Sequence, residues 1–369
     1  MKLSKCQACQ NALHFNNTVC LNCEHAVGYL QDRFEMSAIE RRGQAWRALA
    51  APEALYASCE NAKFGVCNWL VRADGKAKFC ESCRHNRLVP DLSVDGNLER
   101  WRKIELAKRY VFRSLMRWRL PTPDRIEDPN EGLVFDLIGE PIGPDGVSKP
   151  LLTGHDQGLI TLNIAEADDD ERERRRTSMG EVYRTLIGHF RHEIGHFYWD
   201  RLIRDTDRIE EYRAKFGDER QDYDAALKRH YESGPPADWR ESFVSSYASC
   251  HPWEDFAETW AHYIHIVDAL ETARSYGIDV EAEFSPELAS EGLNCEPYFA
   301  KDASQLIRAW IPLTVAINGV NRSMGQPDLY PFVLSNVVMA KLQFVHSLIR
   351  SAGRDQADLE APPVAAQAA

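Results

Sequence analysis

Two kinds of hydrophobic spacing follow one another along this chain, and each predicts a different element. Residues 97–119 combine tryptophan, arginine and apolar side chains in the pattern of an amphipathic helix. Between Gly132 and Ile164 the pattern changes to short β-type runs separated by turns rich in glycine and proline, and these runs are Leu133–Leu137 and Leu159–Ile164. Helical spacing then returns and predicts a helix over 179–202, helices within the polar stretch 200–246, and a helix from Pro252 onward. Two further helices are predicted, over Ala303–Ile317 and over Pro331–Arg350, and Pro312 should kink or break the first of these.

The predicted helix over 179–202 has signals at its start and in its middle. Ser178 precedes it and Glu181 follows three residues later, which predicts a capping box at the first turn. Gly195 lies well inside the helix, where the lack of a side chain allows another segment to approach closely.

This helix contains the sequence His192-Glu193-Ile194-Gly195-His196, an H-E-x-x-H motif. Residues four apart share one helix face, so His192 and His196 can bind one zinc ion while Glu193 beside them handles a water proton. The alternative is a buried helix with two hydrogen-bonded histidines. We expect His189, three residues before His192, to pack nearby rather than to bind the same ion, because it lies too far along the helix from His196.

A second segment, from Tyr247 to Tyr263, places acidic residues among aromatic ones. Pro252 suits the first turn of a helix, and Glu254 and Glu258 then lie four apart on one face. Acids among aromatic residues are costly to bury without a partner, and a zinc ion with its histidines would be one. The alternative is a half-exposed helix with solvated glutamates. His262 can reach this site or pack in the helix interface, and Cys250 is more simply a buried thiol than a nucleophile.

Eight of the ten cysteines lie before residue 84, in two sets of four. The first is Cys6-x2-Cys9 with Cys20-x2-Cys23, and the second is Cys59-x7-Cys67 with Cys80-x2-Cys83. Each set predicts one structural zinc site with all four positions filled by thiolates. A disulfide framework is the disfavoured alternative, and cross-braced pairing between the two sets stays open.

Composition and charge limit the remaining possibilities. The chain has 369 residues and a net charge of −12, but residues 1–90 hold 12 basic and 8 acidic residues, so the remainder carries −16. This balance does not favour nucleic-acid binding. No apolar run approaches the roughly 20 residues that span a bilayer, and the N-terminus lacks a secretory signal. We therefore expect a cytoplasmic protein with no membrane segment.

These patterns predict an α+β protein with four parts. Residues 1–90 form a cysteine-rich zinc-ribbon region, 91–122 a helical linker, 123–350 a mostly helical domain with a small β-sheet, and 351–369 a disordered tail.

The two helical segments together resemble the gluzincin type of zincin metallopeptidase, in which a glutamate on a later helix is the third zinc ligand. The stretch Glu254-Asp255-Phe256-Ala257-Glu258 resembles the E-x-F-A-E stretch of the anthrax lethal factor catalytic domain. The resemblance implies that Glu254 is the third ligand, that Glu258 stands behind the ligands, and that the phenol of Tyr247 stabilises the oxyanion. The cysteine pairs followed by residues 179–196 resemble the bacterial zinc-binding metallopeptidases with an N-terminal zinc ribbon.

The resulting hypothesis is a zinc-dependent peptidase with about three zinc ions, one catalytic and two structural. His192, His196 and Glu254 would hold a zinc ion with one position left for water, and Glu193 would take the water proton. Leu159–Ile164 would be the sheet edge on which a peptide substrate pairs, and the ribbons would dock a substrate or a protein partner. The alternatives are an idle zincin-like adaptor that acts through its ribbons, which the intact Glu193 disfavours, and hydrolysis of a non-peptide amide.

Overall fold

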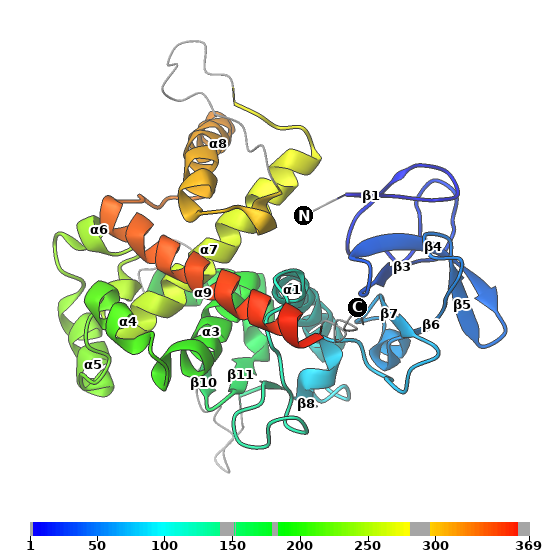
Figure 1. The fold of residues 1–369 in the computed structure, drawn as a ribbon, viewed down its shortest axis with the longest axis horizontal. Helices are drawn as coiled ribbons and strands as arrows, with labels where there is room; N and C mark the ends of the chain where they lie inside the picture. The colour runs from blue at the N-terminus through cyan, green and yellow to red at the C-terminus, as the bar shows by residue number, and fades with distance from the viewer. Residues whose placement is uncertain (1–2, 141–150, 152, 179–183, 281–295, 361–369) are drawn as a thin grey trace, which may run out of the picture.

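The structure is a computed structural model that describes residues 3–140, 151, 153–178, 184–280 and 296–360. A β-rich N-terminal lobe lies at one end of the molecule, and the helices pack into a larger body beside it (Figure 1). The described residues thus have the predicted α+β organisation, with cysteine clusters and sheets first and a mostly helical part with a small sheet after them.

The N-terminal lobe contains more regular structure than metal-bound loops alone. Two short strands, β1 (Ser4–Lys5) and β2 (Ala12–Leu13), form a hairpin. A closed five-stranded barrel follows, and the parallel pairing of its first and last strands completes the ring. Its strands are β3 (Val27–Leu30), β4 (Glu35–Arg42), β5 (Ala45–Ala48), β6 (Leu55–Ser58) and β7 (Trp69–Arg72). Buried residues such as Leu30, Tyr56 and Leu70 give the barrel a core of its own.

A four-stranded sheet lies in the larger body. Its order is β10 (Gly154–Asp156), β11 (Leu159–Asn163), β9 (Val134–Ile138) and β8 (Asn86–Leu88). The two predicted β-type runs are therefore strands, β9 and β11. The expectation that Leu159–Ile164 forms a sheet edge is wrong, because β11 is paired on both sides and β10 is the edge strand next to it.

Helices make up most of the body. They are α1 (Asn97–Arg117), α2 (Asp169–Ser178), α3 (Leu186–Trp199), α4 (Ile209–Phe216), α5 (Tyr223–Ser233), α6 (Trp239–Ser242), α7 (Pro252–Ser275), α8 (Ala303–Ser323) and α9 (Asn336–Glu360). Short turns of other helix types include η2 (Cys83–His85), η3 (Ile164–Ala167) and η5 (Tyr247–Ser249). Pro252 occupies the first turn of α7, as predicted.

Three helix ends differ from the sequence-based expectation. Ser178 ends α2 and does not cap the motif helix. Thr185 caps α3 instead, by accepting a hydrogen bond from the Gly188 N–H at 3.0 Å. The predicted capping box is therefore wrong, and its second residue, Glu181, lies outside the described residues. Helix α8 continues through Pro312 to Ser323, because apolar side chains on both sides of the proline are buried against neighbouring helices.

The third difference concerns the C-terminal helix. Helix α9 begins at Asn336 rather than at Pro331, and the Ser335 hydroxyl accepts a hydrogen bond from the Val338 N–H at 3.2 Å near its start. The helix runs to Glu360, so the part of the predicted disordered tail from Ser351 to Glu360 is helical. The rest of that tail, 361–369, lies outside the described residues.

Helices α3 and α7 pack against each other in the centre of the body. A Cβ atom built on Gly195 would lie 2.9 Å from the Ala257 Cα atom, so the two backbones touch where α3 has no side chain. The predicted close approach at Gly195 is thus confirmed. Near this contact the rings of Tyr198 and Trp260 stack with centroids 4.8 Å apart.

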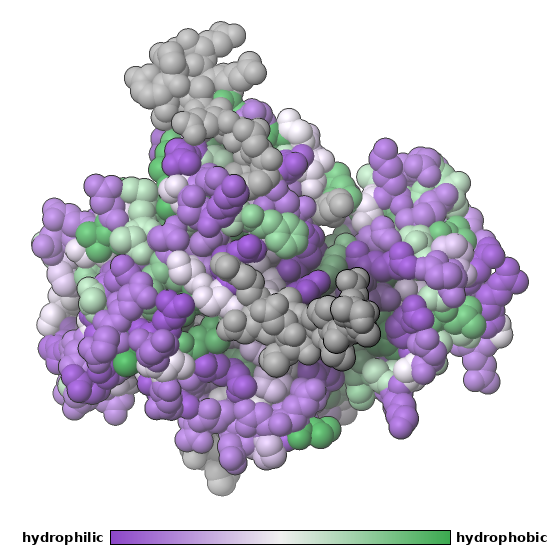
Figure 2. All heavy atoms as spheres, viewed as in Figure 1, coloured by the Kyte–Doolittle hydropathy of each residue, from purple (hydrophilic) through white to green (hydrophobic). Residues whose placement is uncertain are grey.

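The face of the molecule drawn in Figure 2 is mostly polar. On the face drawn in Figure 2, hydrophilic residues predominate and apolar ones are scattered among them. Among the described helices, none has the length and apolar content that crossing a membrane requires.

The close contact predicts the effect of a methyl group at position 195. Gly195→Ala should lower the melting temperature, because overpacking a tight interface costs about 1–3 kcal/mol. Gly319→Ala in α8 is the matched control, since a Cβ there meets nothing within 4 Å and alanine favours the helix. Circular dichroism during heating, at equal zinc content, measures the melting temperature of both variants. A Gly195→Ala protein as stable as the wild type would contradict the contact.

Candidate active site

The three predicted ligands of the catalytic metal converge in the structure. His192 and His196 lie one turn apart on α3, and Glu254 lies in the first turn of α7. The Glu254 Oε2 atom is 2.9 Å from His192 Nε2 and 3.5 Å from His196 Nε2, and the two nitrogens are 3.1 Å apart. All three ligand atoms therefore point at one small volume.

The donor atoms of this group fit a divalent metal ion. Burial lowers the pKa of His192, but hydrogen bonds and negative charge from Glu254 and Glu258 raise it well above its ordinary range, so the site strongly favours positive charge. Glu254 Oε2 is buried, and in the described part of the chain it has no hydrogen-bond donor outside this group of ligands. Two imidazoles and a carboxylate are typical ligands of zinc at catalytic sites.

Residues behind the ligands fix their orientation. The His192 Nδ1–H donates to Glu258 Oε1 at 2.8 Å, which leaves the Nε2 lone pair directed at the other ligands. The Ser245 hydroxyl donates to the second Glu258 oxygen at 2.6 Å. Glu258 thus contacts a ligand from behind, at the place where the sequence resemblance puts it.

Aromatic side chains enclose the other two ligands. The Trp253 ring packs on His196 with centroids 3.7 Å apart. The Tyr223 hydroxyl of α5 donates a hydrogen bond to Glu254 Oε1 at 2.7 Å. Tyr223 and Ser245 carry no signal in the sequence, because neither belongs to a motif nor stands at a diagnostic spacing from one.

A cavity of about 570 Å³ opens beside the ligands. Glu193 and Tyr247 line it together with His192. The Glu193 side chain is mostly buried, and this burial raises the pKa of its carboxyl group. Tyr247 lies on η5, and its ring centroid is 6.0 Å from that of His192. Burial, and to a smaller extent the negative charge of Glu254, raises the pKa of its phenol. The structure therefore brings both predicted catalytic residues to the ligands.

The other residues that the sequence raised have separate places. His189 lines the same cavity, with its Nδ1 atom 3.6 Å from a Glu166 oxygen, and stands apart from the three converging ligands. His262 also lines the cavity, and its Nδ1 atom is 2.7 Å from the Tyr330 hydroxyl. Burial raises the pKa of the Cys250 thiol, which keeps it protonated and disfavours a nucleophilic role.

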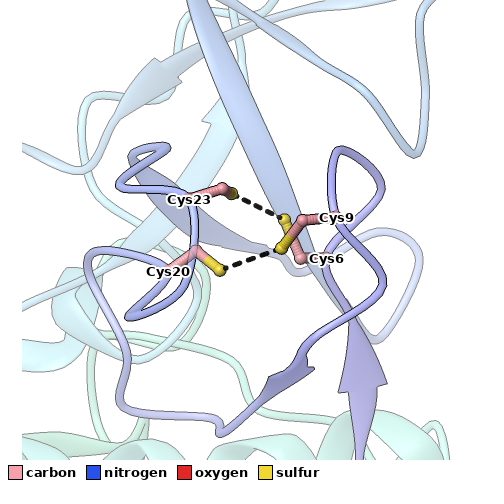
Figure 3. A group of neighbouring side chains, drawn as sticks. All are labelled: Cys6, Cys9, Cys20 and Cys23. Carbon is pink, nitrogen blue, oxygen red and sulfur yellow. Dashed lines mark hydrogen bonds between the residues drawn. The ribbon is translucent and has the colours of Figure 1, made fainter.

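The first set of cysteines forms one cluster near the N-terminus (Figure 3). Its sulfur atoms are 3.6 Å apart in the pairs Cys6–Cys23 and Cys9–Cys20. This separation is too long for a disulfide, and four sulfurs bound to one tetrahedral zinc at 2.3 Å would be roughly 3.8 Å apart. The cluster therefore has the dimensions of a thiolate zinc site.

The second set forms its own cluster, so the described structure shows no cross-braced pairing between the sets. Cys59, Cys67, Cys80 and Cys83 are all buried, and the sulfurs of Cys67 and Cys80 are 3.7 Å apart. By contrast, Cys9 and Cys23 of the first cluster are partly exposed.

Comparison with protein families agrees with this arrangement. The model of the family described as "Putative zinc-binding metallo-peptidase" matches residues 97–348, more than half of the chain. The chain belongs to this metallopeptidase family. A zinc-ribbon domain family also matches, over residues 3–94.

Relatives of the chain occur in mycobacteria. Proteins of Mycobacterium bovis and of two strains of Mycobacterium tuberculosis are 40% identical to it over 353 residues, which cover 95% of this chain and 96% of theirs. All three carry the description "uncharacterized protein". No solved structure gives a significant match to this member of the metallopeptidase family.

The burial of the clusters predicts the order in which they lose metal. We expect about three zinc ions per chain, one for each group of converging ligands. The cluster with two partly exposed cysteines should release zinc to a metallochromic chelator faster than the fully buried cluster. Cys9→Ser should remove the faster cysteine phase, whereas Cys250→Ser should keep all three ions. An unchanged zinc count in Cys9→Ser would contradict the first site.

Proposed function

We propose that this protein is a zinc-dependent metallopeptidase of the gluzincin type. His192, His196 and Glu254 would hold the catalytic zinc, and the two cysteine clusters would each hold a structural zinc. The convergence of these three ligand atoms beside a cavity that also contains Glu193 is the observation that carries the proposal. The family match supports it, since it covers both ligand helices.

Two side chains that line the cavity, Glu193 and Tyr247, suit peptide hydrolysis. A zinc ion bound there would supply Lewis-acid chemistry, polarising a carbonyl and making water more acidic. Glu193 accepts a proton from water and passes it to the leaving amine, and its raised pKa suits both transfers. The Tyr247 phenol keeps its proton and can donate a hydrogen bond to the oxygen that becomes negative.

The edge strand β10 offers a place for the substrate backbone. Among the described residues it pairs only with β11, so its other edge would be the place for an extended peptide. Its central residue, His155, lies with its ring centroid 6.2 Å from that of His196, which places the strand beside the ligand helix. A peptide on β10 would therefore run past the metal ligands.

The N-terminal lobe would bind another protein. The ribbons and the barrel would dock a protein substrate or another protein, and the eight thiolates would suit the reducing cytoplasm. An idle adaptor would not need Glu193 in the cavity, and its presence there favours an enzyme. A non-peptide amide is the alternative substrate for the same ligands.

Removing the base tests the proposed activity. Glu193→Gln should keep the catalytic zinc but reduce cleavage of casein or unfolded protein about 10²–10⁴-fold, because the amide cannot accept the proton. Mass spectrometry measures the zinc content, and the release of peptides measures the rate of cleavage. Glu232→Gln, an exposed acid-to-amide change on α5, is the control and should leave cleavage unchanged. Undiminished turnover in Glu193→Gln would refute the assignment.

A further inference from the structure

Helix α5 lines the cavity although the helix itself is mostly exposed. Ala226 is its one buried residue. Tyr223, Leu227 and Tyr231 nevertheless all line the cavity, and their spacing of four residues places them on one helix face. One face of this helix thus packs on the candidate active site.

The strongest of these contacts reaches a metal ligand. The Tyr223 hydroxyl donates to Glu254 Oε1 at 2.7 Å, while Oε2 of the same carboxylate faces both histidines. The two oxygens of Glu254 therefore have different partners. A hydrogen bond to one oxygen fixes the rotation of the carboxylate and so directs the other oxygen at the metal position.

Aromatic contacts hold both ends of α5 around the same site. The Tyr223 ring lies edge-on to Trp253, with centroids 5.8 Å apart, and Trp253 in turn covers the ligand His196. At the other end, the His230 ring lies edge-on to Tyr247 at 5.9 Å. Both ends of the helix thus contact side chains that lie next to a ligand histidine.

Glycines with left-handed backbone angles flank α5 on both sides. Gly217 before it and Gly234 after it both have positive φ angles, of 103° and 74°. A Cβ atom on Gly234 would meet nothing within 4 Å, so packing does not restrain this end. At its other end the helix also contacts His251, whose ring centroid lies 5.2 Å from that of Tyr223.

We propose that Tyr223 is a positioning residue for the third metal ligand and that it couples metal binding to the packing of α5 against the cavity. This inference rests on the proposed metal centre. Because coupling between two equilibria is reciprocal, the Tyr223 hydroxyl strengthens metal binding, and the bound metal holds α5 in place.

Zinc affinity tests the positioning role without an activity assay. In the full-length protein, Tyr223→Phe removes the hydroxyl but keeps the ring, and we expect the affinity of the catalytic site to fall about 10–100-fold in competition with a chelator. Tyr231→Phe is the matched control, because its ring lies on the same helix and lines the same cavity but contacts His230 instead. Its zinc affinity should equal that of the wild type.

Hydrogen exchange tests the coupling. Amides of α5 should exchange faster in His196→Ala, which loses the catalytic zinc but keeps the cysteine sites, than in the wild type. Tyr223→Phe with zinc bound should also exchange faster in α5, whereas the barrel should show no change in either variant. A shift confined to α5 would support the coupling.

Two results would overturn the inference, and they differ. If the wild type binds the catalytic zinc and Tyr223→Phe binds it equally well with unchanged exchange in α5, Tyr223 does not position the ligand, and the proposed function stands. If the wild type binds zinc at the cysteine clusters alone, the metal centre itself is absent and both proposals fail.

Discussion

The backbone contact between α3 and α7 is the constraint on which the candidate active site depends. Two histidines on one helix supply only two ligands, and a glutamate side chain is short. The third ligand can reach them only if its helix comes as close as Gly195 allows. The contact point, Ala257, lies one turn after Glu254, and Gly195 directly precedes His196. The glycine inside the motif therefore brings the ligands together.

The contact with α3 does not by itself fix the position of α7 along its axis. Buried ion pairs fix this position. Three acids of α7 each pair with a base from a different helix: Asp255 with Lys341 of α9, Asp268 with Arg191 of α3, and Glu271 with Arg113 of α1. Such pairs add little net stability, but a shift of α7 by one turn would leave several charges buried without partners, at several kcal/mol each. The same pairs thus fix where Glu254 stands relative to α3.

The sequence predicted the candidate site best where a residue pattern is typical of one kind of chemistry. The H-E-x-x-H spacing, the acids in an aromatic helix and the paired cysteines predicted which residues converge, and Gly195 predicted the close helix contact. Local patterns failed where several residues satisfy the same rule. Ser178 and Thr185 both suit a helix cap, and only the packing of α3 selects the second. Tyr223 carried no signal, since its role depends on where α5 folds back.

The second cysteine cluster joins the N-terminal lobe to the helical body. Turn η2 begins at Cys83, and β8 follows it directly and pairs in parallel with β9 in the sheet of the helical body. The Cys83 sulfur also lies 3.7 Å from a carboxylate oxygen of Glu105 on α1. A metal in this cluster would fix the start of β8, and through β9 and β11 it would support the sheet that carries the edge strand β10. The cysteines that the sequence assigns to a separate region are therefore part of the framework of the candidate active site.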